Sequence, residues 1–228
     1  MIEANLEWVL ERVRKACERS GRDPGAVRVM AVTKSQEASL IREARDAGIA
    51  LFGENRVQEA RKKVSEGLFD DVCLCMIGHL QTNKASMAAR IFDEVHSVDS
   101  ERVASALAKY AAMYRKGPLP ILIEVNAGRD PRKHGVAPEG ALQLARYVMS
   151  LPSLRLKGLM TVAPASGEAE ARMCFRSLRM LRDDMVGAGI DPENLRELSM
   201  GMSGDFDIAV EEGATIIRLG TILFGPRS

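Results

Sequence analysis

Lys34 is the residue whose type and position most directly suggest chemistry. It follows an apolar run at residues 29–32, so the lysine stem begins at the end of a buried segment. Partial burial disfavours the ammonium form of a lysine, and the free amine attacks an aldehyde to form a Schiff base. An isolated lysine at the end of a strand is more often a solvated charge. The interpretation of Lys34 therefore depends on the residues around it.

Two short segments near the C-terminus combine glycine with hydroxyl-bearing residues. Residues 200–204 read Met-Gly-Met-Ser-Gly, and Thr221 follows Gly220. Where such a segment precedes a helix, exposed backbone N–H groups and hydroxyls form a cradle for phosphate. The same glycines also permit tight turns without any ligand. The residues alone leave both interpretations open.

Arg218 lies within an apolar run at residues 215–220. Its side chain points either inward, toward a site at the end of its strand, or outward to a helix carboxylate such as Glu211 or Glu212. An inward guanidinium would give the site a hydrogen-bond donor that is always charged. Both orientations are open at this stage.

These residues are positioned by a regular alternation of short apolar runs and helical patterns. The apolar runs, which we predict to be strands, cover residues 28–33, 51–53, 72–77, 94–98, 120–125, 155–160, 195–200 and 215–219. Helical periodicity follows at residues 37–47, 57–66, 101–115, 138–150 and 170–188, with an extra helix at residues 2–19 before the first strand. Eight strands alternating with helices predict an α/β fold, a (β/α)8 TIM barrel formed by residues 1–228 as a single domain. The alternative is an open doubly wound sheet, which is built from the same units.

Polar residues end the predicted strands along the whole chain. They include Lys34, Asn55, His79, Asp99, Asn126, Thr161, Ser199, Ser203, Arg218 and Thr221. In a closed barrel these strand ends meet at one mouth, where active sites of this architecture lie. In an open sheet the functional residues gather at a single switch point instead. The spread of polar strand ends therefore favours the barrel.

Composition and spacing exclude several classes of function. A formal net charge of +1 argues against nucleic acid as a partner, and no apolar run approaches membrane-spanning length, so we expect a cytoplasmic protein without a membrane partner. The three histidines are far apart in the sequence and show no ligand spacing, which argues against a metal site. The sequence contains no GxSxG elbow, Walker A loop or GxGxxG fingerprint.

Several motifs together establish a resemblance to a known family. They are Ala-Val-Thr-Lys at 31–34, Phe-Gly-Glu-Asn at 52–55, Ile-Gly-His-Leu-Gln-Thr-Asn-Lys at 77–84, His-Ser-Val-Asp at 96–99, Lys-His-Gly at 133–135, Gly-Leu-Met-Thr at 158–161, Leu-Ser-Met-Gly-Met-Ser at 198–203 and Arg-Leu-Gly-Thr at 218–221. In these motifs the chain resembles the pyridoxal phosphate homeostasis protein family. The resemblance implies a barrel like the N-terminal domain of alanine racemase, carrying pyridoxal 5′-phosphate (PLP) but not the second, β-rich domain of that enzyme.

The resemblance also implies roles for individual residues. Lys34 matches the lysine that holds PLP as a Schiff base, and Arg218 matches the arginine that faces the pyridine nitrogen. The remaining matches are Ser203, Gly220 and Thr221 in the phosphate site and Asn55, Ser199 and Met202 in the pocket wall.

The function implied by the resemblance is PLP homeostasis, the buffering or delivery of this form of vitamin B6, without strong catalysis. An arginine at the pyridine nitrogen weakens PLP as an electron sink, and Ala38 occupies the position of a proton-transferring tyrosine in alanine racemases. The chain departs from the family at Gln36, where a second lysine is usual, and at Arg56, where tyrosine is frequent.

Two other functions stay open at this stage. One is a PLP-dependent amino-acid racemase of low activity, and the other is a barrel aldolase that uses Lys34 on a sugar phosphate. For the homeostasis protein we expect a monomer, with a dimer as the alternative, and PLP-dependent apoenzymes as partners.

Overall fold

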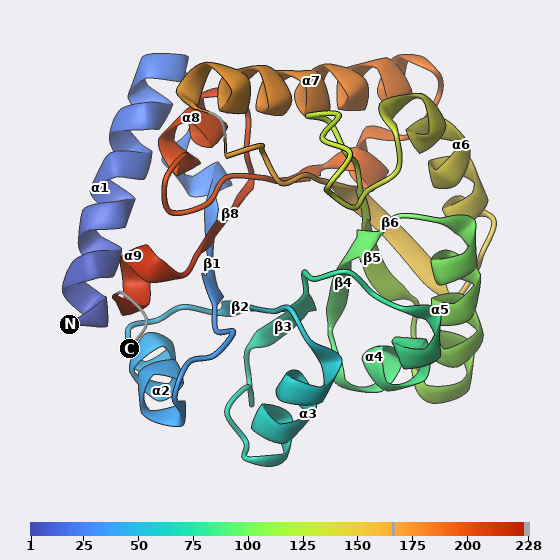
Figure 1. The fold of residues 1–228 in the computed structure, drawn as a ribbon, viewed down its shortest axis with the longest axis horizontal. Helices are drawn as coiled ribbons and strands as arrows, with labels where there is room; N and C mark the ends of the chain where they lie inside the picture. Colours follow the sequence, from blue (N-terminus) through green and yellow to red (C-terminus); the bar gives the residue numbers. More distant parts are fainter. Residues whose placement is uncertain (166, 226–228) are drawn as a thin grey trace.

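Eight parallel strands close into a barrel in the order β1 to β8, with helices packed around the outside (Figure 1). The computed structural model describes residues 1–165 and 167–225. The strands are β1 (Arg28–Val32), β2 (Leu51–Glu54), β3 (Cys73–Met76), β4 (Glu94–Val98), β5 (Leu119–Glu124), β6 (Leu154–Met160), β7 (Glu197–Ser199) and β8 (Ile216–Leu219). The last strand pairs with the first, and Met30 lies opposite Arg218. The predicted (β/α)8 barrel is confirmed, and the alternative of an open doubly wound sheet is wrong.

Helices lie between successive strands, as parallel pairing requires, and two more flank the barrel, one before β1 and one after β8. They are α1 (Ile2–Ser20), α2 (Ala38–Asp46), α3 (Val57–Ser65), α4 (Ala85–Ile91), α5 (Glu101–Tyr114), α6 (Pro138–Met149), α7 (Glu168–Gly187), α8 (Phe206–Glu211) and α9 (Thr221–Phe224), with short 3-10 helices at Pro24–Ala26, Thr82–Lys84 and Pro192–Leu195. The extra helix α1 precedes β1 and packs beside α2, α8 and α9 (Figure 1). Within the described part of the chain, every helix is too short or too polar to cross a membrane.

The alternation of side chains along each strand separates two apolar clusters. Ala31 and Phe52 belong to the larger cluster, which fills the space between the strands and the helices. Met30 and Leu51 belong to a smaller cluster and alternate with them, so they face the inside of the barrel. Lys34 follows Met30 by an even number of residues, so the end of β1 directs it toward the same interior.

Two of the differences from the prediction have identifiable reasons. The seventh strand is shorter than the predicted 195–200 because Leu195 belongs to a 3-10 helix, which Asp191 caps by accepting the Glu193 N–H at 2.9 Å. Helix α4 was not predicted. Its buried positions are all alanines, so no large apolar residue marks its inner face in the sequence.

Candidate functional site

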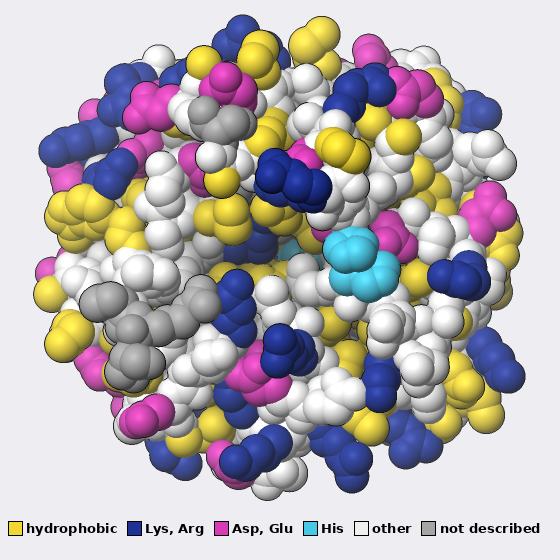
Figure 2. All heavy atoms as spheres, viewed as in Figure 1, with side chains coloured by type: hydrophobic (Ala, Val, Ile, Leu, Met, Phe, Trp, Pro, Cys, Tyr) yellow, Lys and Arg dark blue, Asp and Glu magenta, His cyan; other side chains and the backbone are white. Residues whose placement is uncertain are grey.

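A cavity of about 370 Å³ opens at the carboxyl ends of the strands. It is lined by Val32, Lys34, Gln36, Asn55, Ile77, Val162, Met202, Ser203, Gly204, Arg218, Gly220 and Thr221. Figure 2 shows this face of the molecule, hollowed near its centre with lysine and arginine side chains around the hollow. The cavity unites every residue to which the resemblance assigns a cofactor contact, except Ser199.

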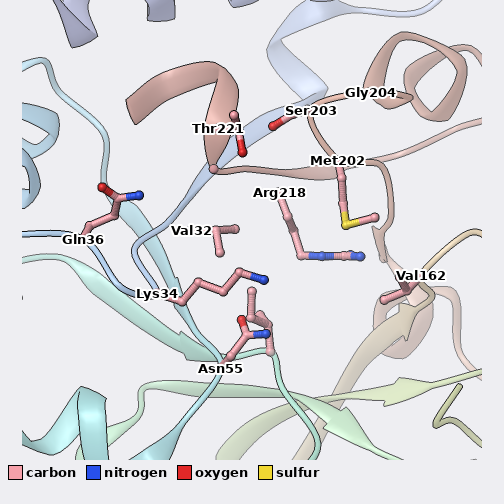
Figure 3. A pocket seen from close by; sticks show the side chains of 12 residues that line it. Val32, Lys34, Gln36, Asn55, Val162, Met202, Ser203, Gly204, Arg218 and Thr221 are labelled. Atoms are coloured by element: carbon pink, nitrogen blue, oxygen red, sulfur yellow. The ribbon is translucent and has the colours of Figure 1, made fainter. Parts of the chain in front are cut away.

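Lys34 projects into this cavity from a tight turn after β1 (Figure 3). The turn is closed by a hydrogen bond from the Gln36 N–H to the Thr33 carbonyl at 3.0 Å. Ser35 adopts a left-handed conformation with φ of 59°, which is uncommon for a residue with a side chain. The Ser35 N–H donates to Glu59 Oε1 at 2.6 Å, so a residue of α3 helps to fix this conformation.

A buried group of charged residues holds the same turn from behind. The Lys63 ammonium donates to the Thr33 carbonyl at 2.6 Å, to Glu54 Oε1 at 2.7 Å and to Glu59 Oε1 at 2.8 Å. The Thr33 hydroxyl also donates to Glu54 Oε1, at 2.7 Å. Burial raises the pKa of Glu54, and its contacts with Lys63 oppose that rise. Sequence analysis missed Lys63, although a glutamate four residues before it on a predicted helix is a recognisable pairing signal.

Arg218 points into the barrel mouth, so its side chain has the inward of the two orientations considered from sequence. Its Nη1 atom donates to Ser199 Oγ at 3.0 Å, and its Nη2 atom donates to the Thr161 carbonyl at 2.8 Å. Glu211 and Glu212, the outward alternatives, pair instead with arginines of α1 and α7. Burial lowers the pKa of Arg218 to about 10, and the group stays cationic at neutral pH. Ser199 thus holds the guanidinium rather than lining the cavity.

The glycine-rich segments form the end of the cavity opposite Lys34. Gly201 has φ of +93°, and a Cβ there would lie 2.5 Å from the Ala209 Cβ, so only glycine lets this loop pack against α8. The Ser203 hydroxyl accepts a hydrogen bond from the Ile222 N–H at 3.3 Å, which joins the loop after β7 to the segment after β8. The hydroxyls of Ser203 and Thr221 lie close together in Figure 3. This arrangement gathers neutral donors at one end of the cavity.

Asn55 completes the wall beside Lys34. Its Oδ1 atom is buried and has no hydrogen-bond partner among the described residues. Its backbone is held by close packing, because a Cβ on Gly78 would lie only 2.3 Å from the Asn55 carbonyl oxygen. A buried acceptor without a partner is costly, so the cavity favours a ligand that donates a hydrogen bond there.

Glu124, at the end of β5, is a buried carboxyl group that sequence analysis did not single out. Burial and the charge of Asp99 raise its pKa to about 7, and Arg218 opposes the rise. Its Oε2 atom has no hydrogen-bond partner within the described residues. This environment arises from neighbouring strands, so the sequence around Glu124 contains no sign of it.

Comparisons with known proteins agree in pointing to one family. The sequence matches the family described as alanine racemase, N-terminal domain, over residues 4–228. It is 42% identical over 224 residues to the pyridoxal phosphate homeostasis protein of Aquifex aeolicus, covering 97% of this chain and 96% of the relative. It is 40% identical over 227 residues to the protein of that name from Pseudomonas aeruginosa, covering 99% and 96%.

Solved structures show the same relationship. The structure of PipY from Synechococcus elongatus with PLP bound has a TM-score of 0.83 and 35% sequence identity, covering 99% of this chain and 100% of that one. An alanine racemase from Clostridium difficile has a TM-score of 0.75 at 14% identity, covering 98% of this chain and 57% of that one. At that identity the similarity to the racemase concerns the fold.

Proposed function

Because the chain belongs to the alanine racemase N-terminal domain family, and within it to the pyridoxal phosphate homeostasis proteins, we propose that it binds PLP and serves PLP homeostasis. The observation that carries the proposal is the meeting of Lys34 and Arg218 in one cavity that ends in hydroxyl groups (Figure 3). An amine, a fixed cation and a set of neutral donors match the aldehyde, the ring nitrogen and the phosphate of this cofactor.

The cavity fits PLP in size and in the chemistry of its donors. A volume of about 370 Å³ lies within the range of small-molecule sites, roughly 300–1,000 Å³. The unpartnered Oδ1 of Asn55 gives a polar group of the ligand an acceptor. When bound, PLP supplies an aldehyde for imine formation and a ring that withdraws electrons.

Individual residues would hold the cofactor in a defined way. Lys34 would supply the amine for the aldehyde of PLP, a condensation that releases one water molecule. Ser203, Gly220 and Thr221 would hold the phosphate, since backbone N–H groups and hydroxyls favour an anion. Arg218 would donate to the ring nitrogen, and its hydrogen bonds to Ser199 and to the Thr161 carbonyl fix the direction of the guanidinium.

The same residues favour binding over catalysis. A guanidinium at the ring nitrogen leaves that nitrogen without a proton and so limits the electron-withdrawing power of the ring. Ala38, the first residue of α2, has only a methyl group where a racemase needs a proton-transferring side chain. We therefore propose a protein that stores PLP and releases it to apoenzymes, and that has little activity of its own.

An open cavity suits a protein that takes up and releases its ligand. Met202 lines the cavity and is 38% exposed, and Thr221 is also exposed, so the phosphate end lies near solvent. A deeply enclosed cofactor would leave only after a large rearrangement. This geometry supports exchange of PLP with the surrounding solution.

Replacing Lys34 with alanine tests the proposal. The wild-type protein mixed with PLP should show the absorbance band of a Schiff base, and borohydride followed by peptide mass analysis should place the reduced adduct on Lys34. The Lys34→Ala variant should lose the band, and Lys116→Ala, which changes an exposed lysine away from the cavity, should keep it. A band that persists in Lys34→Ala would show that another amine holds the cofactor.

Hydrogen exchange tests the claim of weak catalysis. The wild-type protein with PLP and L-alanine in deuterated water should incorporate deuterium at the α-carbon far more slowly than an alanine racemase does under the same conditions. Sustained incorporation that depends on Lys34 would instead establish the protein as a racemase.

A further inference from the structure

Two histidines and an aspartate meet at the mouth of the barrel, away from the proposed PLP cavity. The imidazole rings of His79 and His134 stack with centroids 3.8 Å apart and an interplanar angle of 11°. His79 Nδ1 lies 3.2 Å from Asp99 Oδ2. One ligand atom from each of the three side chains lies within 4.8 Å of the other two. Figure 2 shows histidine side chains together on this face.

The barrel brings these residues together from three neighbouring strand ends. His79 follows β3, Asp99 follows β4, and His134 lies in the segment between β5 and α6. The carboxyl ends of parallel strands share one face of a barrel, so residues far apart in the sequence become neighbours there. The spacing of the histidines, which argued against a metal site, therefore does not describe their arrangement in the fold.

The segment that carries His134 is held against the end of β5. Gly135 has φ of +110°, and a Cβ there would lie 2.6 Å from the Asn126 nitrogen. The Asn126 N–H donates to the Val136 carbonyl at 2.9 Å, and the Asn126 side chain donates to the Asp130 carbonyl at 2.8 Å. These contacts fix the backbone on both sides of His134, so the point from which the His134 side chain projects is also fixed.

Asp99 and His79 are also held in place. Ser100 is the N-cap residue of α5. Its hydroxyl donates to Asp99 Oδ1 at 3.1 Å, which leaves Oδ2 directed to His79. Leu80, next to His79, is 1% exposed and anchors that segment in the core. The three potential ligands therefore stand on fixed backbone, and only exposed ends of side chains need to move.

We propose that His79, Asp99 and His134 bind one divalent transition-metal ion of the Zn²⁺ and Co²⁺ class. Two imidazoles and one carboxylate are a ligand set that suits these ions. At bond lengths of about 2.0–2.1 Å, tetrahedral ligand atoms lie about 3.3 Å apart, and a metal lies in the plane of each imidazole that binds it. The stacked rings of His79 and His134 must therefore rotate about their side-chain bonds, and the ligand atoms must approach one another, before both rings bind one ion. The three ligands leave at least one coordination position for water or an anionic ligand.

A second cavity of about 610 Å³ adjoins two of these side chains, and it is lined by His79, Leu80, Gln81, Thr82, Asn83, Asp99, Ser100, Arg102 and Val103. None of these residues lines the PLP cavity. The two sites therefore share the mouth of the barrel but no lining residue, so each should bind its ligand when the other is disabled.

A second group of potential ligands, Cys73, Cys75 and Glu94, is a weaker candidate. Burial raises the pKa of the Cys75 thiol well above its ordinary value, and a metal needs the thiolate. Glu94 is already engaged, since its carboxylate bonds His96 at 3.0 Å and Lys157 at 2.7 Å. The chemistry of this group opposes a cation, whereas the side chains at the mouth are accessible.

Titration of tag-free protein with Co²⁺, followed by its visible spectrum, and with Zn²⁺, followed by calorimetry, tests the proposal. We expect one equivalent to bind. Loss of an outer hydrogen-bond partner of a metal ligand already weakens affinity about 10–100-fold, so His79→Ala, His134→Ala and Asp99→Asn should each weaken it at least tenfold. Thermal unfolding of each variant checks that it remains folded.

Two control variants separate the possible outcomes. Lys34→Ala should bind the metal as the wild type does while lacking the PLP band, and His79→Ala should keep the PLP band while losing the metal. Cys73→Ser should leave metal binding unchanged. The proposal is overturned if the histidine variants bind as tightly as the wild type, if only Cys73→Ser loses binding, or if the wild type binds neither ion.

Discussion

Replacing Lys63 with methionine tests whether buried charge holds the turn that carries Lys34. The Lys63 ammonium donates to Glu54 at 2.7 Å, to Glu59 at 2.8 Å and to the Thr33 carbonyl at 2.6 Å. Methionine keeps an unbranched, flexible apolar stem but removes the charge and all of these hydrogen bonds. The carboxylates of Glu54 and Glu59 then lose their cationic partner.

The expected loss of stability is large because the pair is shielded from solvent. The side chain of Glu54 is 0% exposed and that of Lys63 is 10% exposed. Removing one partner of a buried ion pair costs about 3–5 kcal/mol, since the other charge is left uncompensated. For a chain of this length, a loss of about 3 kcal/mol lowers Tm by about 6–12 °C.

The loss should depend on pH in a predictable direction. Burial raises the pKa of Glu54, and without the opposing Lys63 that pKa rises further. A carboxyl group whose pKa is raised in the folded state contributes stability that is fully present below its unfolded pKa and is lost as pH rises through its folded pKa. The stability deficit of Lys63→Met is therefore smaller at pH 5 than at pH 8.

Urea unfolding and PLP titration of the same variant distinguish two roles of Lys63. Lys62→Met is the matched control, since it makes the same change at an exposed neighbour and should alter the free energy of unfolding by no more than about 0.5 kcal/mol. If the turn positions Lys34, Lys63→Met also weakens PLP binding at least tenfold. If both variants have the same free energy of unfolding at pH 8, the buried ion pair does not stabilise the protein as we predict. A destabilised variant with unchanged PLP affinity would refute its role in positioning Lys34.

Two further predictions concern the barrel mouth. Because burial and Asp99 raise the pKa of Glu124 to about 7, its stabilising contribution is lost as pH rises from its unfolded pKa of 4.5 through 7, a loss of about 3 kcal/mol. Glu124→Gln in metal-free, PLP-free protein should remove that part of the decline in unfolding free energy between pH 5 and 8, and an unchanged pH profile would contradict the assignment. Gly135→Ala should cost about 3 kcal/mol, from positive-φ strain and the clash with Asn126, whereas Gly48→Ala, at φ of +86° in open space, should cost about 1 kcal/mol. Equal costs in urea unfolding would show that the segment around Gly135 yields to the added methyl group.

The sequence predicted the order of the strands and seven of the twelve residues that line the cavity containing Lys34. Apolar runs alternate with helical patterns at regular spacing, and that pattern leaves few arrangements other than a barrel. Lys34 could be singled out because it follows an apolar run, and Arg218 because it is a charged residue within one. The directions of these side chains could not be predicted, because the inward orientation of Arg218 depends on hydrogen bonds to Ser199 and Thr161, which come from other strands.

Features that depend on contacts between distant segments were not predictable. The stacked pair of His79 and His134 joins residues separated by more than fifty positions, and it exists only because the strands close into a barrel. The raised pKa of Glu124 likewise comes from burial and from the charge at Asp99. Periodicity reports which face of an element is buried, but it contains no information about which polar residues of other elements share that environment.

The positions of the proposed cofactor contacts are compatible with the proposed role of binding PLP without strong catalysis. Lys34 follows the first strand and Arg218 lies in the last, and these two strands pair directly, so closure of the barrel itself assembles the amine and the cation. Ala38 lies instead at the first residue of a helix outside the barrel wall. A change of side chain there leaves the strands, their register and the hydrogen bonds of Arg218 untouched. Acid–base chemistry can therefore be gained or lost at that position while the cofactor site persists, because the fold supports the site and single residues decide the reaction.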